Sequence, residues 1–230
     1  CNIPWAILFD PTSACNLHCI GCWAAEYGHT LNLSFDVMDK IVREGKALGC
    51  HFYLLTGGEP LMRKKDILRL CRKHPDCEFH AFTNGTLIDD AFCDEVTDVG
   101  NLSFSLSIEG FREVNDSRRG EGDFAKVMHA MDLLRKHGIV FGTSICYTRK
   151  NIDTVTSDEF LDLLIKKGVW FTIPMAMSNR ASSSIIPAPI STTRACSRAC
   201  SSRSSKNMPK ASPSTTTICA RVRCWKIRSI

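Results

Sequence analysis

The alternation of strand-like and helix-like segments over residues 5–171 constrains the fold of this 230-residue chain more than any other feature. Short apolar runs closed by Gly, Pro or Ser are typical of buried parallel strands; they occur at 5–13, 51–60, 78–85, 101–110, 140–148 and 169–171. Amphipathic helical patterns lie between them, at 33–50, 65–74, 89–99, 123–138 and 157–168. This order predicts an α/β fold, a partial (β/α)6 TIM-like barrel of parallel strands.

Polar motifs follow the ends of these predicted strands. A cysteine-rich loop, "ACNLHCIGC" at 14–22, follows the first strand, and "TGGEP" ends the second at 56–60. "TNG" at 83–85 and "SIEG" at 107–110 end the third and fourth. In barrels of parallel strands the chemistry lies at the carboxyl ends, so the sequence predicts one site built from these loops.

The cysteine loop has the spacing Cys15-x3-Cys19-x2-Cys22. A closed structural zinc site needs four ligands, often as two separated pairs, whereas three close cysteines suit a metal centre with one open position. Half of a zinc site is the alternative interpretation. Five other cysteines lie on apolar faces or at helix ends, and we predict that they are small buried residues and not ligands: Cys50, Cys71, Cys77, Cys93 and Cys146.

These motifs together carry a resemblance. The three cysteines, followed one βα unit later by Gly57-Gly58-Glu59-Pro60, resemble the radical S-adenosylmethionine (radical SAM) superfamily over about residues 5–171. The segment "DPTSACNLHCIGCWAAEYG" is similar to the SPASM-type branch, whose members carry a C-terminal auxiliary-cluster domain.

The resemblance implies that Cys15, Cys19 and Cys22 hold a [4Fe–4S] cluster whose fourth iron is chelated by S-adenosylmethionine. Reductive cleavage of that cofactor would form a 5′-deoxyadenosyl radical, which abstracts hydrogen from a peptide or small-molecule substrate. An electron donor such as flavodoxin or ferredoxin is implied as a partner. The alternative is a catalytically dead iron–sulfur or metal-binding remnant of such an enzyme.

The same resemblance implies a set of S-adenosylmethionine contacts at the strand ends. Arg118 or Arg119 would pair with the methionine carboxylate, although two adjacent arginines are also compatible with a solvated pair. Asn84 belongs to a sequence that equally suits a plain turn. The full set of expected contacts is Gly57, Gly58, Glu59, Pro60, Asn84, Ser107, Glu109 and Arg118.

The sequence predicts a cytoplasmic protein. No signal peptide is visible, and without one clustered cysteines are typical of metal ligands or free thiols. No apolar run approaches the roughly 20 residues that a membrane span needs. We therefore expect neither a membrane nor a nucleic acid as a partner.

The chain changes character near residue 171. Residues 1–171 hold 19 Lys/Arg and 24 Asp/Glu, whereas residues 172–230 hold 10 basic residues, no acidic one and no apolar period. This contrast predicts a core domain at 1–171 and an irregular basic tail at 172–230.

Three interpretations of the tail remain. Its cysteines, Cys196, Cys200, Cys219 and Cys224, could be ligands of a second cluster or a zinc ion, or the tail could be a disordered nucleic-acid-binding arm. The third interpretation, which we favour, is translation out of frame after an internal deletion. A one-base shift permits cysteine-bearing segments similar to the auxiliary domain of the SPASM-type branch. The tail would then be disordered or poorly packed, and its cysteines would bind nothing specific.

Overall fold

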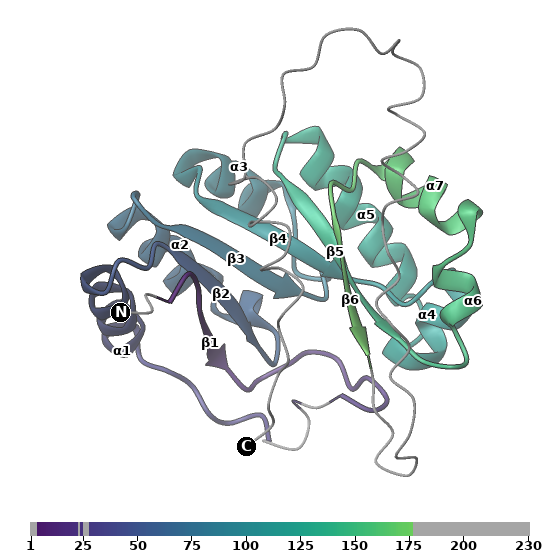
Figure 1. Cartoon of the computed structure of the whole chain (residues 1–230), viewed down its shortest axis with the longest axis horizontal. Helices are drawn as coiled ribbons and strands as arrows, with labels where there is room; N and C mark the ends of the chain where they lie inside the picture. The colour runs from purple at the N-terminus through teal and green to yellow at the C-terminus, as the bar shows by residue number, and fades with distance from the viewer. Residues whose placement is uncertain (1–3, 23, 25–27, 177–230) are drawn as a thin grey trace, which may run out of the picture. The chain divides into compact units, whose positions relative to one another are not determined.

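Six parallel strands form one sheet in the order in which they occur along the chain (Figure 1). The structure is a computed structural model that describes residues 4–22, 24 and 28–176. The strands are β1 (Ile7–Thr12), β2 (Phe52–Gly57), β3 (Glu78–Thr83), β4 (Leu102–Ser107), β5 (Phe141–Tyr147) and β6 (Thr172–Ala176). Because β1 and β6 are the two edges of the sheet, the partial barrel predicted from the sequence is confirmed.

Helices cover the outer face of the sheet (Figure 1). The five predicted helices are present as α1 (Phe35–Ala47), α2 (Lys64–Lys73), α3 (Asp90–Val99), α5 (Asp123–Lys136) and α7 (Asp158–Lys167). Ser34 caps α1 as expected, since its side chain accepts a hydrogen bond from the amide of Val37. Three short helices were not predicted: η2 (Pro60–Arg63), α4 (Arg112–Arg119) and α6 (Ile152–Val155).

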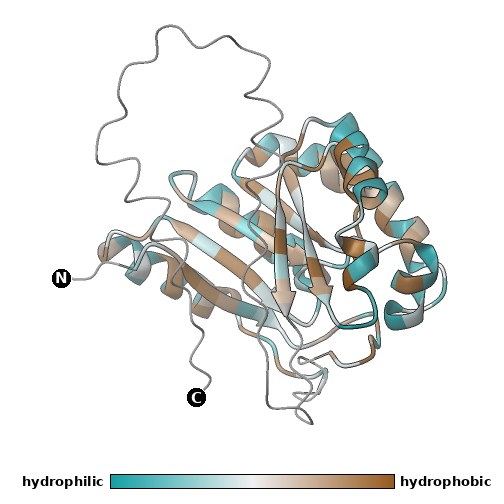
Figure 2. Ribbon diagram, turned by 45° about the vertical axis from the view of Figure 1, so that its right-hand side comes forward, coloured by the Kyte–Doolittle hydropathy of each residue, from teal (hydrophilic) through white to brown (hydrophobic). Residues whose placement is uncertain are grey.

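The hydrophobic core lies between the sheet and these helices. Alternate residues of the central strands, such as Tyr53, Phe79 and Phe104, are fully buried there together with Met38 of α1 and Leu70 of α2. Apolar residues accordingly gather on the strands and on the helix faces turned toward them (Figure 2). Side chains alternate between the two faces of a strand, so the residues between these core positions point to the inner face of the barrel.

That inner face carries a buried polar residue, His80 of β3. Its ring nitrogens lie 3.0 Å from the hydroxyl of Ser103 and 2.8 Å from the hydroxyl of Ser105, both on β4. Aromatic rings of Phe82 and Phe171 contact it. Burial lowers the pKa of His80 to about 4, so the ring is neutral at pH 7.

The sixth strand differs from the prediction. It was expected to begin within 169–171, and the amide of Trp170 does donate to the carbonyl of Phe141, but the strand proper is Thr172–Ala176, inside the segment expected to be tail. This strand is not recognisable from the sequence, because Thr172 and Pro174 interrupt the apolar run. An edge strand tolerates a proline, since one side of its ladder is unpaired.

The rest of the tail lies outside the described residues, and so do the tail cysteines and the predicted disorder of 177–230. The chain divides into two units at residues 179 and 180, of which the second falls entirely in this part. Among the described residues, no helix combines the length and apolar character required to cross a membrane.

Candidate cofactor site at the carboxyl ends of the strands

The cysteine loop directly follows β1. Cys15, Cys19 and Cys22 are free thiols, each half-buried, and together with Leu17, His18 and His29 they line a small cavity. Burial raises the pKa of the Cys15 and Cys19 thiols. Metal binding would reverse this effect, because a bound metal favours the thiolate.

The three thiols suit a multinuclear cluster better than a single ion. Among the described residues, the sulfur atoms of the three cysteines do not all lie within 4.8 Å of one another. An iron–sulfur cluster takes one thiolate on each of several irons and therefore spreads its protein ligands apart. The donor set and its spread fit a cluster bound by three cysteines.

Polar groups surround two of the sulfur atoms. The amide of Leu17 donates a hydrogen bond to the Cys15 sulfur at 3.4 Å, and Nη1 of Arg119 lies 4.0 Å from the Cys19 sulfur. Nearby positive charge lowers the pKa of the Cys19 thiol and partly offsets its burial. Both contacts favour sulfur in its anionic, ligating form.

The Gly-Gly turn at the end of β2 packs directly against the cysteine loop. The amide of Gly58 donates to the carbonyl of Thr12 at 2.9 Å, and the amide of Glu59 donates to that of Ala14 at 2.8 Å. A Cβ atom on Gly58 would overlap the Ala14 carbonyl oxygen, and one on Gly57, where φ is +102°, would lie 2.5 Å from the Thr12 carbonyl oxygen. Only glycine permits this approach.

The side chain of Glu59 is buried behind the turn and holds its shape. Its Oε1 accepts hydrogen bonds from the Leu61 amide at 2.9 Å and the Thr83 hydroxyl at 2.7 Å, and its Oε2 accepts one from the Asn84 amide at 2.7 Å. Burial raises the pKa of Glu59, although these donors oppose the shift. Pro60 then begins η2 at a position where its missing N–H costs nothing.

Asn84 connects the end of β3 to the cysteine loop. Its side-chain amide donates to Oδ1 of Asn16 at 2.8 Å, and its Oδ1 accepts from the amide of Thr86 at 3.0 Å. Asn16 in turn donates to the Thr86 hydroxyl at 2.8 Å. The predicted site residue Asn84 is therefore next to the cysteines and linked to them through Asn16.

Glu109 and the two arginines form a buried ion cluster on the other side of the loop. Oε1 of Glu109 accepts from Nη1 of Arg118 at 2.5 Å and from Nη2 of Arg119 at 2.6 Å. Its Oε2 accepts from the Cys146 amide at 2.9 Å. The carbonyl of Arg118 accepts from the amide of Ile20 at 2.8 Å, which ties the cysteine loop to the end of α4.

Ser107, the last predicted contact, ends β4 and is half-buried opposite Ser144 in the ladder with β5. Sequence reasoning missed two residues that hold the others in place, Asn16 and Thr83. A polar residue inside a cysteine loop or before a turn carries no distinguishing pattern, so only the fold identifies them.

Known proteins share sequence similarity with this chain. The sequence model of the radical SAM superfamily matches residues 9–164. The chain is 29% identical to the AdoMet-dependent heme synthase of Methanosarcina barkeri, over 81% of this chain and 56% of that protein. It is 28% identical to the mycofactocin maturase MftC of Mycolicibacterium smegmatis, over 75% of this chain and 44% of that protein.

Solved structures agree on the fold. SuiB of Streptococcus suis bound to S-adenosylmethionine superimposes with a TM-score of 0.68 at 19% identity, covering 78% of this chain and 42% of that one. A native anSMEcpe structure with bound AdoMet and the Cp18Cys peptide gives 0.62 at 22%, covering 74% and 50%.

The chain spans about half the length of the curated relatives that it matches. Maturases among these relatives agree with the expected SPASM-type branch. The family match at residues 9–164 includes the three cysteines, the Gly-Gly turn and the Glu109 cluster. This chain therefore belongs to the radical SAM superfamily.

Proposed function

We propose that residues 1–171, completed by β6, are the core domain of a radical SAM enzyme. Cys15, Cys19 and Cys22 would hold a [4Fe–4S] cluster, and S-adenosylmethionine would bind beside it at the carboxyl ends of the strands. We also propose that a donor such as flavodoxin or ferredoxin reduces this cluster and that the protein is cytoplasmic.

The observation that carries the proposal is the contact between the cysteine loop and the Gly-Gly turn. Two backbone hydrogen bonds join them, and the space for a Cβ on Gly58 is filled by the carbonyls of Ser13 and Ala14. The motifs are separated by more than 30 residues in sequence, yet they lie against each other at the carboxyl ends of the strands.

When bound, the cluster and S-adenosylmethionine supply an electron and a 5′-deoxyadenosyl radical for hydrogen abstraction. The chain's own task is to place them. Three thiolates would fix the cluster and leave a position without a protein ligand, while the Gly57–Gly58 turn packs against the loop that carries them. Glu59 would act on the ligand through the turn, because its own oxygens already accept three hydrogen bonds.

The Glu109 cluster sets the charge beside the cysteines. Arg119 contacts the Cys19 sulfur and Glu109 at once, so it would offset negative charge on a thiolate-bound cluster. Arg118 shares Glu109 with it and is the residue we assign to the methionine carboxylate. Ser107, at the end of β4, is assigned to the same cofactor.

The substrate class follows from the relatives. The names of MftC and of the sulfatase-maturating enzyme of Bacteroides thetaiotaomicron describe maturases, and another relative is named a heme synthase. We therefore propose a peptide or small-molecule substrate for this chain. Its choice would depend on residues beyond the shared core, since the chain spans only part of these relatives.

Reductive cleavage of S-adenosylmethionine tests the proposal. The anaerobically reconstituted full chain should contain about four irons and form 5′-deoxyadenosine when dithionite is added. Cys19→Ala should lose both iron and product, whereas Cys93→Ala, which removes a buried thiol of α3 remote from the loop, should keep both. A bound cluster without 5′-deoxyadenosine would instead indicate the catalytically dead remnant.

A further inference from the structure

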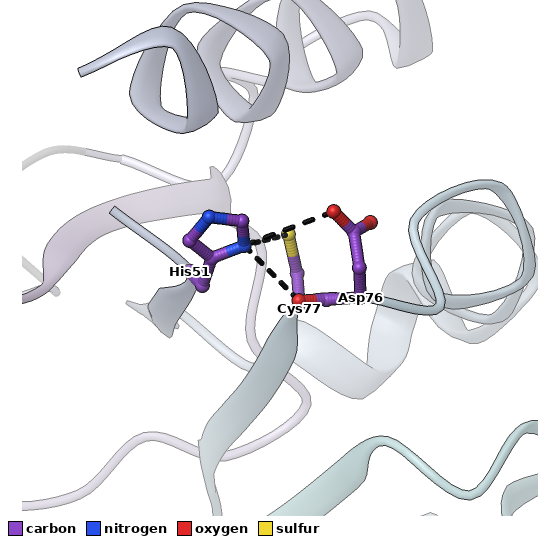
Figure 3. Close-up of side chains that lie close together, drawn as sticks. All are labelled: His51, Asp76 and Cys77. Carbon is purple, nitrogen blue, oxygen red and sulfur yellow. Dashed lines mark hydrogen bonds and ion pairs between the residues drawn. The ribbon is translucent and has the colours of Figure 1, made fainter. Parts of the chain in front are cut away.

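Three metal-ligating side chains meet at the opposite end of the sheet from the cysteine loop. His51 immediately precedes β2, and Asp76 and Cys77 immediately precede β3. Figure 3 shows the imidazole, the carboxylate and the thiol turned toward one another from these two segments. Because the strands are parallel, this group lies at their amino ends, and the mechanism proposed above does not use it.

The spacing of the ligand atoms is close to that of a tetrahedral site. Nδ1 of His51 lies 3.9 Å from Sγ of Cys77 and 3.7 Å from Oδ2 of Asp76, and all three ligand atoms lie within 4.8 Å of one another. Ligand bonds of about 2.0–2.3 Å at tetrahedral angles separate such atoms by roughly 3.3–3.6 Å. Shifts of a few tenths of an ångström would therefore bring Nδ1 of His51 to ligand spacing from both the Cys77 sulfur and the Asp76 oxygen.

The backbone of both segments is already fixed. The amide of Glu78 donates to the carbonyl of His51 at 2.8 Å, and the amide of Cys77 donates to that of His74 at 3.1 Å. The Asn101 side chain donates to the carbonyl of Cys77 at 2.9 Å. These bonds hold the two connections side by side before any ion arrives, so little chain entropy would be lost on binding.

The carboxylate of Asp76 can serve two partners. Its Oδ1 accepts a hydrogen bond from Lys46 of α1 at 2.7 Å, while its Oδ2 faces His51. Lys46 would thus orient the carboxylate without occupying the ligating oxygen, in the way that outer-shell groups position metal ligands. Nδ1 of His51 lies 3.1 Å from the Asp76 backbone carbonyl, which can only accept a hydrogen bond, so without an ion Nδ1 carries the proton and donates it. Binding of an ion at Nδ1 would replace this hydrogen bond and place the proton on Nε2.

Access and charge also suit a divalent cation. The side chains of His51 and Asp76 are 52% and 50% exposed, whereas Cys77 is buried beneath them as an inner ligand. One thiolate and one carboxylate balance the two charges of the ion, and a Cys, His and Asp donor set suits zinc.

We propose that His51, Asp76 and Cys77 form a zinc site, with water in the fourth position, that joins the α1–β2 connection to the α2–β3 connection. The site revises the interpretation of Cys77 as a merely buried thiol. It does not depend on the proposed function, because it lies at the other end of the strands and involves none of the cofactor-site residues.

Equilibrium dialysis of the full, iron-loaded chain against buffered Zn²⁺ tests this proposal. The wild-type chain should bind one zinc ion at this site. His51→Gln and Asp76→Asn should each lower the affinity for this ion by at least about tenfold, and Cys77→Ser should abolish its binding. Because the side chains of His51 and Asp76 are half-exposed, their substitution should leave the core intact, and the test then does not depend on the folding of Cys77→Ser. Cys93→Ser is the matched control, since it removes a buried thiol that does not belong to a group of three ligand atoms within 4.8 Å of one another.

Zinc K-edge X-ray absorption adds a direct reading that iron does not mask. The difference between the wild-type and His51→Gln spectra should correspond to zinc with one sulfur and otherwise nitrogen and oxygen ligands. Iron content should be equal in all of these variants. Zinc binding by His51→Gln and Asp76→Asn with wild-type stoichiometry and affinity would overturn the site.

Discussion

The amide of Gly58 donates a hydrogen bond to the carbonyl of Thr12 at 2.9 Å, and this contact joins the Gly-Gly turn to the loop that carries the cysteines. A side chain on Gly58 would overlap the carbonyls of Ser13 and Ala14. Those carbonyls belong to the backbone that leads into Cys15. The geometry of the turn and the placement of the thiols are therefore coupled.

Gly58→Ala should disturb the cysteine loop. Its Cβ would force backbone atoms apart, and overpacking of this kind costs about 1–3 kcal/mol. We expect iron incorporation after reconstitution to fall well below the wild-type level while the far-ultraviolet circular dichroism is retained. Gly100→Ala is the control. Its φ of +69° is unfavourable for alanine, but the space around the new Cβ is open, so this variant should bind iron normally. Equal iron content in Gly58→Ala and wild type would show that the contact does not matter.

Glu59→Ala should destabilise the fold more than Glu59→Gln. The buried carboxylate accepts hydrogen bonds from Leu61, Thr83 and Asn84, and an unsatisfied buried donor costs about 1–3 kcal/mol. Glutamine keeps one acceptor oxygen, whereas alanine keeps none and leaves a cavity. Urea unfolding of the three proteins at pH 7 measures the difference, and an alanine variant as stable as the glutamine variant would contradict the role assigned to these bonds.

His80 should make stability pH-dependent. Burial lowers the pKa of His80 from the ordinary 6.5 to about 4. Between these pH values the histidine is protonated in the unfolded chain and neutral in the folded chain. Stability should therefore rise with pH between about 4 and 6.5, and acidification from pH 7 to pH 5 should cost about 1–2 kcal/mol through this residue alone. The loss of stability over that range should be smaller in His80→Gln than in wild type. Identical losses in the two proteins would mean that His80 is not a neutral buried group.

The sequence predicted most of the sheet because its strands obey a simple rule. Residues such as Tyr53, Phe79 and Phe104 alternate with others along central strands, and that alternation with the intervening helices is legible from a single sequence. The rule failed at β6, an edge strand that contains Pro174. It also failed at α4, whose polar sequence has one buried residue, Asn115, and follows no apolar period.

The site was predictable as a set of motifs but not as a network. Spacing identified Cys15, Cys19 and Cys22, and the Gly-Gly-Glu-Pro sequence identified the turn. The sequence could not indicate that Glu109 would bind both Arg118 and Arg119, because these contacts depend on how the end of α4 is placed relative to the end of β4. The same holds for His51, Asp76 and Cys77, which only the pairing of β2 with β3 brings together.

The coding DNA tests our interpretation of the tail. If residues 172–230 are translated out of frame, the shifted frame after the Phe171 codon should encode Asn-Gly-Asp-Val-Glu-Pro-Cys, and later Arg-Pro-Cys-Pro-Leu-Leu-Glu-Asn-Pro-Glu. Restoring the frame and the deleted segment should then raise solubility and add iron beyond the first cluster. Codons that forbid both hidden segments would leave the tail as a genuine basic arm.

Electron paramagnetic resonance of the dithionite-reduced full chain, with and without S-adenosylmethionine, tests the central claim most directly. Three thiolates leave the cluster one position without a protein ligand, so S-adenosylmethionine should bind there and shift the signal of the reduced cluster. Cys19→Ala should give no such signal, and Cys93→Ala should behave as wild type. A reduced-cluster signal that S-adenosylmethionine leaves unchanged, or one that persists fully in Cys19→Ala, would contradict the assignment of Cys15, Cys19 and Cys22.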